Sequence, residues 1–302
     1  MRYFLPDGEG AVSMTSSSMN GRVIAVTGGA RGIGREIARQ LAVAGARVAI
    51  GDVDGAAARA TADELGRAGG SVEGLELDVT DTESFASFLA AVEDHWGPID
   101  VLVNNAGVMW VGRFDEEPES ATARQIAVNL HGVIRGVRLA APAMRERGRG
   151  QIVTVASAAS KVAPPGESTY AATKHGVLGY LTGVREELHG SGVHISVIMP
   201  GVVDTALAAG TATGAAKLLT PADVAKSVVA VIRRPRFEVT IPRYVGPLAR
   251  LVTVFPQFAR DFAIRRMVPD QVRSTDKSAR SAYESRAVTD DDGGTSSGRN
   301  GI

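Results

Sequence analysis

Short apolar runs alternate with segments of helical periodicity along most of the chain. Residues 22–26 and 47–52 are rich in valine, isoleucine and alanine and are the first two predicted strands. Ile33, Ile37 and Leu41 recur every four residues between them and form one apolar helix stripe. The same alternation predicts strands at 75–79, 101–105, 151–155, 194–198 and 237–241, and helices near 81–95, 119–146, 168–189 and 221–233. Seven strands joined by helical crossovers predict a single α/β domain with a doubly wound parallel sheet, over residues 21–243.

The two ends of the chain follow other patterns. Residues 1–20 are rich in serine and glycine, and residues 271–302 are polar with a run of three aspartates, so both are expected to be disordered. Residues 244–270 predict an amphipathic helix, because apolar residues at 248, 251, 252, 255, 258 and 262 step by three and four. Pro256 is expected to bend it. The stripe either packs on its own domain or, through residues 247–267, covers the substrate, contacts a subunit or rests on a membrane surface.

Composition narrows the function classes. Lysine plus arginine and aspartate plus glutamate both number 33, so nothing in the net charge favours nucleic acid as a partner. The chain has no cysteine, which excludes disulfides and thiolate catalysis, and its five histidines lack zinc-type spacing, so no metal site is expected. No apolar run is long enough to span a bilayer and the start lacks a signal-peptide pattern, so a cytoplasmic protein is expected.

A glycine-rich turn, Thr27-Gly28-Gly29-Ala30-Arg31-Gly32-Ile33-Gly34, joins the first predicted strand to the first predicted helix. In such a turn one glycine permits the bend, a second lets the backbone approach a pyrophosphate, and a third lets helix and strand pack closely. The start of the helix adds free N–H groups and a positive dipole end. The spacing differs from the common GxGxxG, and an ordinary glycine-rich turn is the alternative. The turn predicts dinucleotide binding.

Asp52 is the predicted ribose-binding acid. It ends the second strand 18 residues after Gly34, close to the offset of about 20 residues at which such an acid is found. The alternative is a turn-forming role in Asp52-Val53-Asp54-Gly55. Because a carboxylate would repel a 2′-phosphate, Asp52 predicts NAD rather than NADP.

Tyr170, Lys174 and Ser157 are the predicted catalytic set. Tyr170 and Lys174 are at i and i+4 and project from one helix face. A tyrosine has a pKa near 10, and a cation one helical turn away stabilises its phenolate. Beside a dinucleotide, this pair and an upstream serine predict hydride transfer between a nicotinamide and a carbonyl or alcohol.

These motifs together resemble those of the short-chain dehydrogenase/reductase family, single-domain type, over about residues 21–242. Asn104-Asn105-Ala106-Gly107 is similar to the segment after the family's fourth strand, and Asn129 to its fourth catalytic residue. The stretch from Pro200 to Thr205 is similar to the segment that closes over the nicotinamide. The resemblance implies a Rossmann-like fold, and a homodimer or homotetramer formed through the helices near 119–146 and 168–189.

The resemblance also implies roles. Tyr170 is the general acid/base, Lys174 lowers its pKa and holds the ribose, and Ser157 binds the substrate oxygen. Asn129 holds a water, and Asp78 bonds the adenine amine. The cofactor-binding residues it implies are Thr27, Gly28, Arg31, Gly32, Ile33, Gly34, Asp52, Asp78, Val79, Asn105, Ala106, Gly107, Tyr170, Lys174, Pro200, Gly201, Val203 and Thr205.

Three alternatives stand beside an NAD-dependent alcohol dehydrogenase. The first is an NADPH-dependent carbonyl or ketoacyl reductase, in which Arg31 and Arg47 approach the 2′-phosphate. The second is an extended-type epimerase or dehydratase, which the glycine spacing disfavours. The third is a nucleotide-sensing protein without catalysis, disfavoured because no catalytic residue is missing. The expected pocket segments, 108–110, 158–166 and 206–219, are mostly apolar or small, which favours a lipophilic small-molecule alcohol or ketone.

Overall fold

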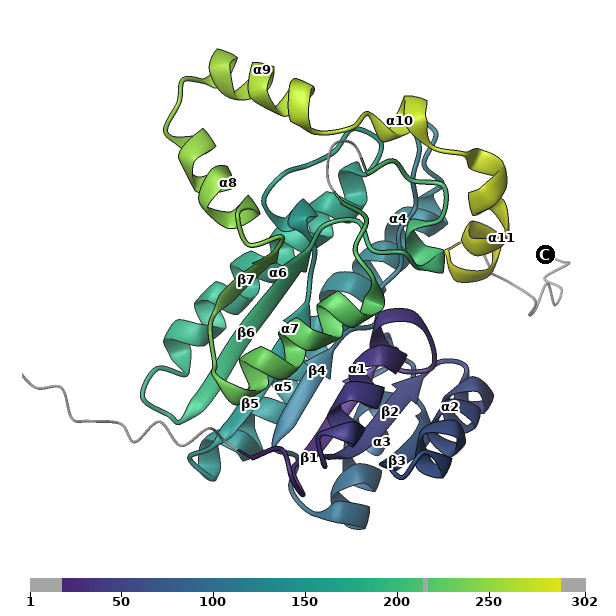
Figure 1. The fold of residues 1–302 in the computed structure, drawn as a ribbon, viewed down its shortest axis with the longest axis vertical. Coiled ribbons are helices and arrows are strands. Elements are labelled where there is room, and N and C mark those ends of the chain that lie inside the picture. Colours follow the sequence, from purple (N-terminus) through teal and green to yellow (C-terminus); the bar gives the residue numbers. More distant parts are fainter. Residues whose placement is uncertain (1–17, 214–216, 289–302) are drawn as a thin grey trace, which may run out of the picture.

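The computed structural model, which describes residues 18–213 and 217–288, contains one parallel seven-stranded sheet (Figure 1). Its order is β3-β2-β1-β4-β5-β6-β7, as in a doubly wound fold. The strands are β1 (Val23–Thr27), β2 (Arg47–Asp52), β3 (Ser71–Glu76), β4 (Val101–Asn104), β5 (Gly150–Val155), β6 (Val193–Pro200) and β7 (Glu238–Ile241). The predicted seven-stranded α/β domain is confirmed.

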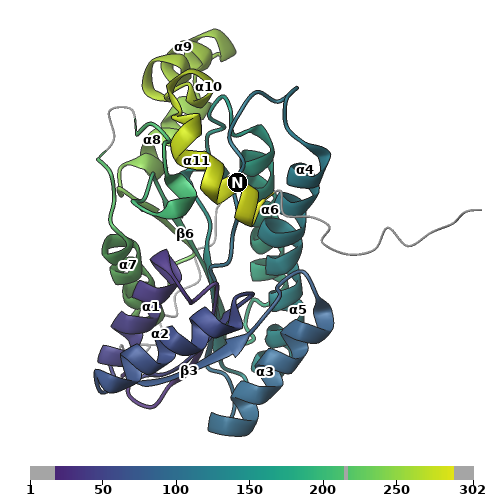
Figure 2. The same ribbon diagram turned by 90° about the vertical axis from the view of Figure 1, so that its right-hand side faces the viewer.

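Helices cover both faces of this sheet (Figure 2). One face packs against α1 (Gly32–Val43), α2 (Gly55–Arg67) and α7 (Pro221–Arg233). The other packs against α3 (Thr82–Trp96), α5 (Gly132–Glu146) and α6 (Ser168–Glu187). Every residue of β1 and β4 is buried, as expected for central parallel strands covered on both sides.

Three elements differ from the sequence prediction. The third strand is Ser71–Glu76 rather than 75–79, because β3 pairs with β2 from Ser71 to Glu76 and the chain then leaves the sheet. Leu77 is buried beyond the strand, so the apolar signal there came from loop packing. Helix α2 was not predicted; it begins where the Asp54 side chain accepts a hydrogen bond from Ala57 N. The helix expected over 119–146 is α4 (Glu119–Gln125), a π-helical turn over Ile126–His131, and α5.

The C-terminal region is more ordered than the sequence suggested. Where one helix bent at Pro256 was expected, the structure has two helices, α8 (Val245–Thr253) and α9 (Gln257–Met267), because the chain leaves the helix before this proline. Where a disordered tail was expected from 271, the structure has α10 (Gln271–Ser274) and α11 (Lys277–Ala287), and they contain fully buried side chains. Residues 289–302 lie outside the described residues.

The disordered N-terminal extension expected over residues 1–20 does not reach residue 20. Met19 is buried in the same core cluster as β1 and α1, because it precedes β1 directly. Residues 1–17 lie outside the described residues. Within the described chain, no helix combines the length and the apolar character that crossing a bilayer would need.

Candidate active site

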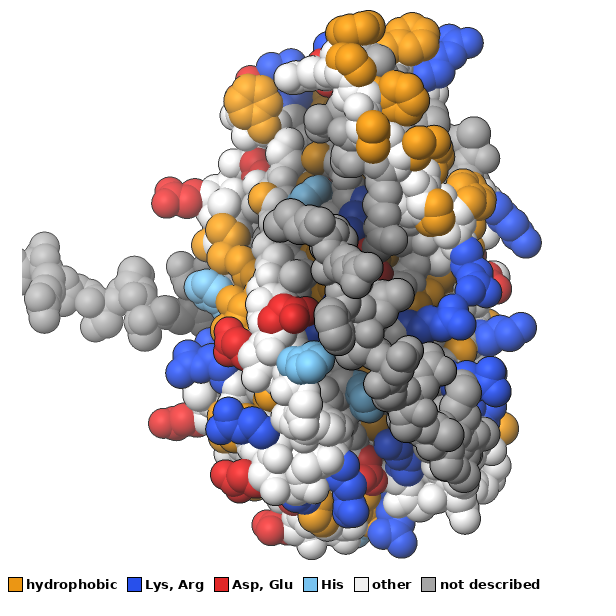
Figure 3. All heavy atoms as spheres, turned by 90° about the vertical axis from the view of Figure 1, so that its left-hand side faces the viewer, with side chains coloured by type: hydrophobic (Ala, Val, Ile, Leu, Met, Phe, Trp, Pro, Cys, Tyr) orange, Lys and Arg blue, Asp and Glu red, His pale blue; other side chains and the backbone are white. Residues whose placement is uncertain are grey.

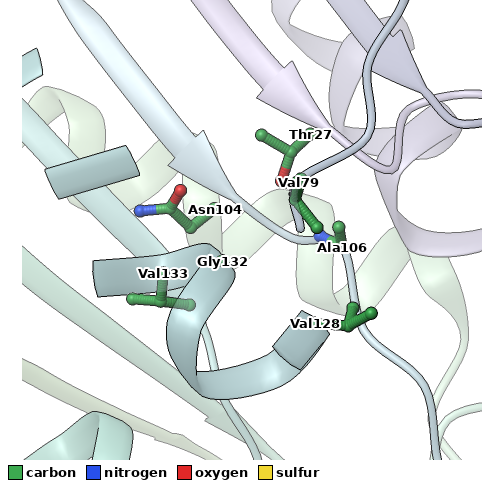
Figure 4. Close-up of a pocket in the computed structure, with 7 residues that line it drawn as sticks. All are labelled: Thr27, Val79, Asn104, Ala106, Val128, Gly132 and Val133. Atoms are coloured by element: carbon green, nitrogen blue, oxygen red, sulfur yellow. Dashed lines mark hydrogen bonds between the residues drawn. The ribbon is translucent and has the colours of Figure 1, made fainter. Parts of the chain in front are cut away.

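The predicted site residues gather at the carboxyl ends of β1, β4, β5 and β6. In the sheet, β1 lies between β2 and β4. The connection that follows β1 and the connection that follows β4 therefore run to opposite faces of the sheet. Such a switch point opens a crevice in doubly wound sheets. A small pocket lies there, lined by Thr27, Val79, Asn104, Ala106, Val128, Gly132 and Val133 (Figure 4). Three of these residues, Thr27, Val79 and Ala106, were predicted to bind the cofactor.

The glycine turn has the geometry that a bound pyrophosphate needs. Gly28 has φ +64°, and a Cβ there would lie 2.8 Å from Ala106 Cα. A Cβ at Gly34 would overlap the carbonyl oxygen of Gly28. The N-cap of α1, Arg31, makes no side-chain cap hydrogen bond, and the first turn carries no acidic residue. Within the turn, Gly29 N donates to Gly51 O and Ala30 N donates to Asp52 Oδ2, so the N–H groups that face an anion are those at the uncapped start of α1, and the residues fit a dinucleotide.

Thr27 and Asn105 hold this turn against β4. Thr27 Oγ1 accepts hydrogen bonds from the backbone N–H groups of Asn105 and Ala106, both at 3.0 Å. Asn105 Nδ2 donates to the carbonyls of Thr27 and Gly28, both at 3.0 Å. Both side chains were predicted as cofactor ligands, but in the structure their polar groups shape the turn.

The Asp52 carboxylate is fixed at the end of β2. Its Oδ2 accepts from Ala30 N at 3.1 Å and its Oδ1 accepts from Asp54 N at 3.2 Å. Arg31 pairs with Asp54 at 3.0 Å, which neutralises the one arginine of the glycine turn. Arg47 begins β2, five residues before Asp52, so at about 3.3 Å per residue it lies roughly 16 Å from the carboxyl edge. The expectation that Arg47 approaches a 2′-phosphate is therefore wrong.

The remaining predicted cofactor residues lie around the turn. Asp78 Oδ1 accepts from Thr80 N at 2.8 Å and from Thr80 Oγ1 at 2.7 Å, which orients it beside the buried Val79. Ile33, at the start of α1, is half-buried and packs against the core. Gly107 follows β4 and lies next to Lys174, as described below.

The loop after β6 crosses over the glycine turn. Pro200 ends β6, and Gly201 N donates to Ile241 O at 2.8 Å. Val203 forms a bridge with Leu219, which anchors the loop. A Cβ built on Gly32 would lie 3.6 Å from Thr205 Cγ2, so this loop reaches the turn across the crevice.

Tyr170, Ser157 and Lys174 converge, as predicted. Ser157 follows β5 and caps a short 3₁₀ turn by accepting from Ala159 N at 3.1 Å, and its hydroxyl lies close enough to Tyr170 to lower the pKa of that phenol. Lys174 Nζ lies 5.4 Å from the centre of the Tyr170 ring. Burial raises the pKa of Tyr170, the charge of Glu167 raises it further, and the Ser157 hydroxyl lowers it. Burial lowers the pKa of Lys174 to about 8.

Asn129 lies in the π-helical turn between α4 and α5. Its Oδ1 accepts from Val108 N and its Nδ2 donates to Val108 O, both at 2.8 Å. Nδ2 also lies 3.2 Å from Thr173 Oγ1 on α6. A Cβ on Gly107 would lie 3.3 Å from Asn129 Oδ1 and 3.7 Å from Lys174 Nζ, so these two groups meet beside Gly107. The extra residue of a π turn aims Asn129 at the site.

Sequence reasoning missed Glu167, Arg280 and Tyr283. Glu167, the N-cap of α6, is buried without capping the helix, and burial raises its pKa to about 7 although Arg280 opposes this. Tyr283 Oη accepts from Met109 N at 3.2 Å, and burial raises its pKa to about 12. A signal for α11 existed, because Asp276 before a run of helix-forming residues is a typical N-cap.

Arg280 attaches α11 to two substrate-side loops. It donates to Met109 O at 2.8 Å and to the carbonyls of Leu207 and Ala209 at 3.0 and 3.1 Å. Its Nε pairs with Glu284 at 2.7 Å, and the side chain is only 1 % exposed. We call α10 and α11, residues 271–288, the C-terminal strap; it covers the site's outer side.

Apolar side chains surround the Tyr170 ring. Met109, Val111 and Ala159 are buried against it, and Leu207 packs on this cluster. The polar side chains that interact with Tyr170 in the described chain include Ser157, Glu167, Lys174 and Tyr283. In the described part of the chain, no group of three or more metal-ligating side chains occurs.

Comparison with known proteins agrees with this geometry. The model of the family described as short chain dehydrogenase matches residues 22–215. The ketoacyl reductase HetN of Nostoc sp. is 35% identical over 229 residues, which are 74% of this chain and 80% of HetN.

Two solved structures are similar over most of their length. A short chain dehydrogenase/reductase from Burkholderia phymatum in complex with NAD has a TM-score of 0.73 at 27% identity, covering 84% of this chain and 98% of its own. A metagenomic short-chain oxidoreductase in complex with NADP has a TM-score of 0.64 at 35% identity, covering 74% and 97%.

Proposed function

The chain belongs to the short-chain dehydrogenase family of oxidoreductases, which act on alcohol and keto groups, and we propose that it interconverts a lipophilic secondary alcohol and its ketone with NAD. The observation that carries the proposal is the convergence of Ser157, Tyr170 and Lys174 beside a glycine turn open to a dinucleotide. When bound, the dinucleotide supplies or accepts the hydride.

Tyr170 is the proposed proton donor and acceptor. Its raised pKa keeps the hydroxyl protonated at neutral pH, as a carbonyl reduction requires. The Ser157 hydroxyl lies close enough to Tyr170 to lower its pKa, so a substrate oxygen placed between them would accept from both hydroxyls. As negative charge develops on that oxygen, Tyr170 gives it a proton.

Lys174 is the proposed cation of this site. With a pKa of about 8, Lys174 is mostly protonated at pH 7. Its Nζ lies 5.4 Å from the centre of the Tyr170 ring, where the positive charge stabilises a Tyr170 phenolate. In alcohol oxidation the phenolate takes the substrate proton, so this stabilisation aids that direction. Asn129, next to Lys174, is proposed to hold the water through which protons exchange with solvent.

NAD is the proposed cofactor. The fixed Asp52 carboxylate stands at the end of β2, where it can accept hydrogen bonds from ribose hydroxyls and repel a 2′-phosphate. The only arginine of the turn is engaged by Asp54. The remaining predicted cofactor residues keep their proposed roles: Asp78 at the adenine, Val79 and Ala106 in the crevice, and Pro200, Gly201, Val203 and Thr205 over the nicotinamide.

The proposed substrate is lipophilic. Met109, Val111, Ala159 and Leu207 supply an apolar surface beside Tyr170. A buried apolar lining with few polar groups selects an apolar ligand with one reacting oxygen.

A second candidate is a ketoacyl reductase, which the similarity to HetN favours. Its substrate would carry a polar acyl carrier. Its expected cofactor would be NADPH rather than NAD. A panel of apolar secondary alcohols and of ketoacyl thioesters, each with NAD and NADP and the reduced forms, would separate the two. A protein that binds nucleotide but turns over nothing in the panel would contradict the catalytic proposal.

Tyr170→Phe tests the mechanism directly. The ring still packs, but the transferable proton is gone, and general acid–base catalysis contributes about 10²–10⁴-fold. We expect kcat to fall by about that factor while the Kd for NAD stays within a few-fold, measured by steady-state kinetics and by calorimetry. Ser281→Ala, on the exposed side of α11, is the control. Wild-type kcat in Tyr170→Phe would mean that the assigned proton donor is wrong.

A further inference from the structure

Helices α8 and α9 form an apolar projection at one end of the molecule. Leu248, Leu251, Val254, Phe255, Phe258 and Phe262 are all exposed, with Val254, Phe258 and Phe262 at 81, 77 and 73%. Figure 3 shows hydrophobic side chains gathered at this end, with lysine or arginine side chains beside them. Figure 1 shows both helices standing away from the sheet. We call these two helices the projecting pair.

The pair is fixed at its base rather than hanging from a linker. Gly246 N donates to Thr240 Oγ1 at 3.0 Å, and Thr240 Oγ1 lies 3.2 Å from Arg243 O. Val245 N donates to Pro242 O at 3.2 Å. At the other end, Gln271 pairs with Ala212 through both amide atoms, at 2.8 and 2.9 Å. The apolar side chains are therefore presented on an anchored element.

Charge separates this region from the rest of the chain. The whole chain has no formal net charge. Residues 243–273 contain six arginines, two aspartates and no lysine or glutamate, so this stretch carries four positive charges. Arg265 and Arg266 are exposed and follow Phe262 by three and four positions, so they continue the phenylalanine stripe of α9.

We propose that the projecting pair is a docking surface for an anionic lipid bilayer. Aromatic and aliphatic side chains enter the headgroup boundary while arginines at its edge meet the lipid phosphates. The helices lie on the bilayer and do not cross it, in keeping with the lack of a spanning helix in the described chain. This inference does not depend on the proposed reaction.

A second copy of the chain fits the surface less well. A two-fold contact would place the same patch on both subunits. A net charge of +4 would then face a net charge of +4, because each stretch has six arginines and only two aspartates. An anionic bilayer satisfies both the apolar side chains and the charge.

Vesicle co-sedimentation of the full chain tests the proposal. The wild type should bind phosphatidylcholine vesicles containing phosphatidylglycerol, and bind vesicles of phosphatidylcholine alone much less. Arg265→Gln with Arg266→Gln should weaken binding about thirtyfold, because each arginine near an anionic surface contributes about fivefold. Phe258→Ser with Phe262→Ser should abolish binding. Raising the salt concentration should weaken wild-type binding.

Two matched controls keep the test specific. Phe114→Ser removes a phenylalanine that is similarly exposed, at 79%, from the loop between β4 and α4. Arg59→Gln with Arg67→Gln removes two exposed arginines from α2. Both should bind as the wild type does, and circular dichroism should show that every variant is folded.

Three outcomes would overturn the proposal: no binding of the wild type to anionic vesicles, equal binding by the projecting-pair variants, or equal loss in the control variants. Light scattering tests the remaining alternative, in which the projecting pair contacts another subunit. If Phe258→Ser with Phe262→Ser changes the oligomer and leaves vesicle binding intact, the surface is a subunit contact instead.

Discussion

At the scale of single residues, Glu167 is a buried acid beside the proposed proton donor. It immediately precedes the first residue of α6, three positions before Tyr170, and its charge raises the pKa of Tyr170. Burial raises its own pKa from the ordinary value of 4.5 to about 7. Because Glu167 ionises near neutral pH, the pKa of Tyr170 is expected to change with pH. Glu167 acts through Tyr170 and is therefore a positioning residue.

Glu167→Gln should raise stability at alkaline pH. Below pH 4.5 Glu167 is protonated in both states; between 4.5 and 7 only the folded state keeps the proton, so the free energy of unfolding falls as pH rises. Above pH 7 the buried charge costs about 3 kcal/mol. Urea unfolding should find the variant more stable than the wild type at pH 8 and equal to it at pH 4.

The same substitution should move the pH profile of alcohol oxidation. Without the Glu167 charge the pKa of Tyr170 falls, so the acidic limb of kcat/KM should shift to lower pH. Glu187→Gln, at the exposed end of α6, is the control and should leave the profile unchanged. An unmoved profile in Glu167→Gln would show that Glu167 acts on stability alone.

Asp52→Ser should relax the choice of cofactor. The wild type is expected to prefer NAD over NADP by at least tenfold in kcat/KM, which corresponds to about 1.4 kcal/mol. Serine keeps a hydrogen-bonding group but removes the charge that faces a 2′-phosphate. Kinetics with both cofactors check this, with Asp63→Ser on the exposed side of α2 as the control. A wild type that prefers NADP would mean that Arg31 outweighs Asp52.

At the scale of elements, the C-terminal strap determines the outer wall of the site. Arg280 makes three hydrogen bonds to carbonyls of loops that flank Tyr170 and one ion pair within α11. Arg280 and the Met109 carbonyl are buried and the carbonyls of Leu207 and Ala209 are part-buried, so removing the arginine leaves these acceptors without that partner. Polar contacts hold the strap at several points, because Gln271 also pairs with Ala212 and Tyr283 Oη accepts from Met109 N, but Arg280 makes the largest number of them.

Arg280→Ala should release the strap. Loss of a buried paired charge typically costs about 3–5 kcal/mol, and here it should appear as faster hydrogen exchange over residues 271–288. KM for apolar substrates should rise more than kcat falls, because the wall is lost and the proton donor is not. Arg273→Ala, 87% exposed on α10, should behave as the wild type. Unchanged exchange in Arg280→Ala would contradict this role.

At the scale of the whole molecule, the family resemblance predicts a dimer or tetramer formed through α4–α5 and α6. Gly179 and Gly183 lie on the exposed side of α6, and a Cβ at either would meet no heavy atom within 4 Å. A flat helix face of this kind allows close approach of a second helix. We propose it as part of the subunit contact.

Gly179→Arg should reduce the size of the assembly by light scattering. The side chain finds open space within its own subunit but would block a helix packed on α6. Gly66→Arg on α2 is a matched control, since it too is an exposed helical glycine with no atom within 4 Å of a built Cβ. Both substitutions favour the helix by about 0.5–1 kcal/mol, so instability cannot explain a change. A monomeric wild type, or an unchanged Gly179→Arg, would exclude this contact.

The sequence by itself determined the sheet and the inner site. Parallel strands buried on both faces need continuous apolar runs, which is why six of the seven strands could be placed closely, and the glycine spacing needs only local geometry. Tyr170 and Lys174 share a helix turn, so their approach is a local property as well. The third strand was misplaced because buried Leu77 extends the apolar pattern past the last paired residue, Glu76.

Only the tertiary structure decided the outer site. Arg280 and Tyr283 are charged or polar residues in a segment of polar composition, and their placement depends on partners some 70 to 170 positions away: three carbonyls for Arg280 and the Met109 N–H for Tyr283. Glu167 gains its raised pKa from that same enclosure. Arg47 was weighed as a 2′-phosphate ligand only for the NADPH alternative, and its distance from Asp52 is set by the length of β2. Long-range contacts leave no periodic trace in the sequence, whereas strands, helices and tight turns do.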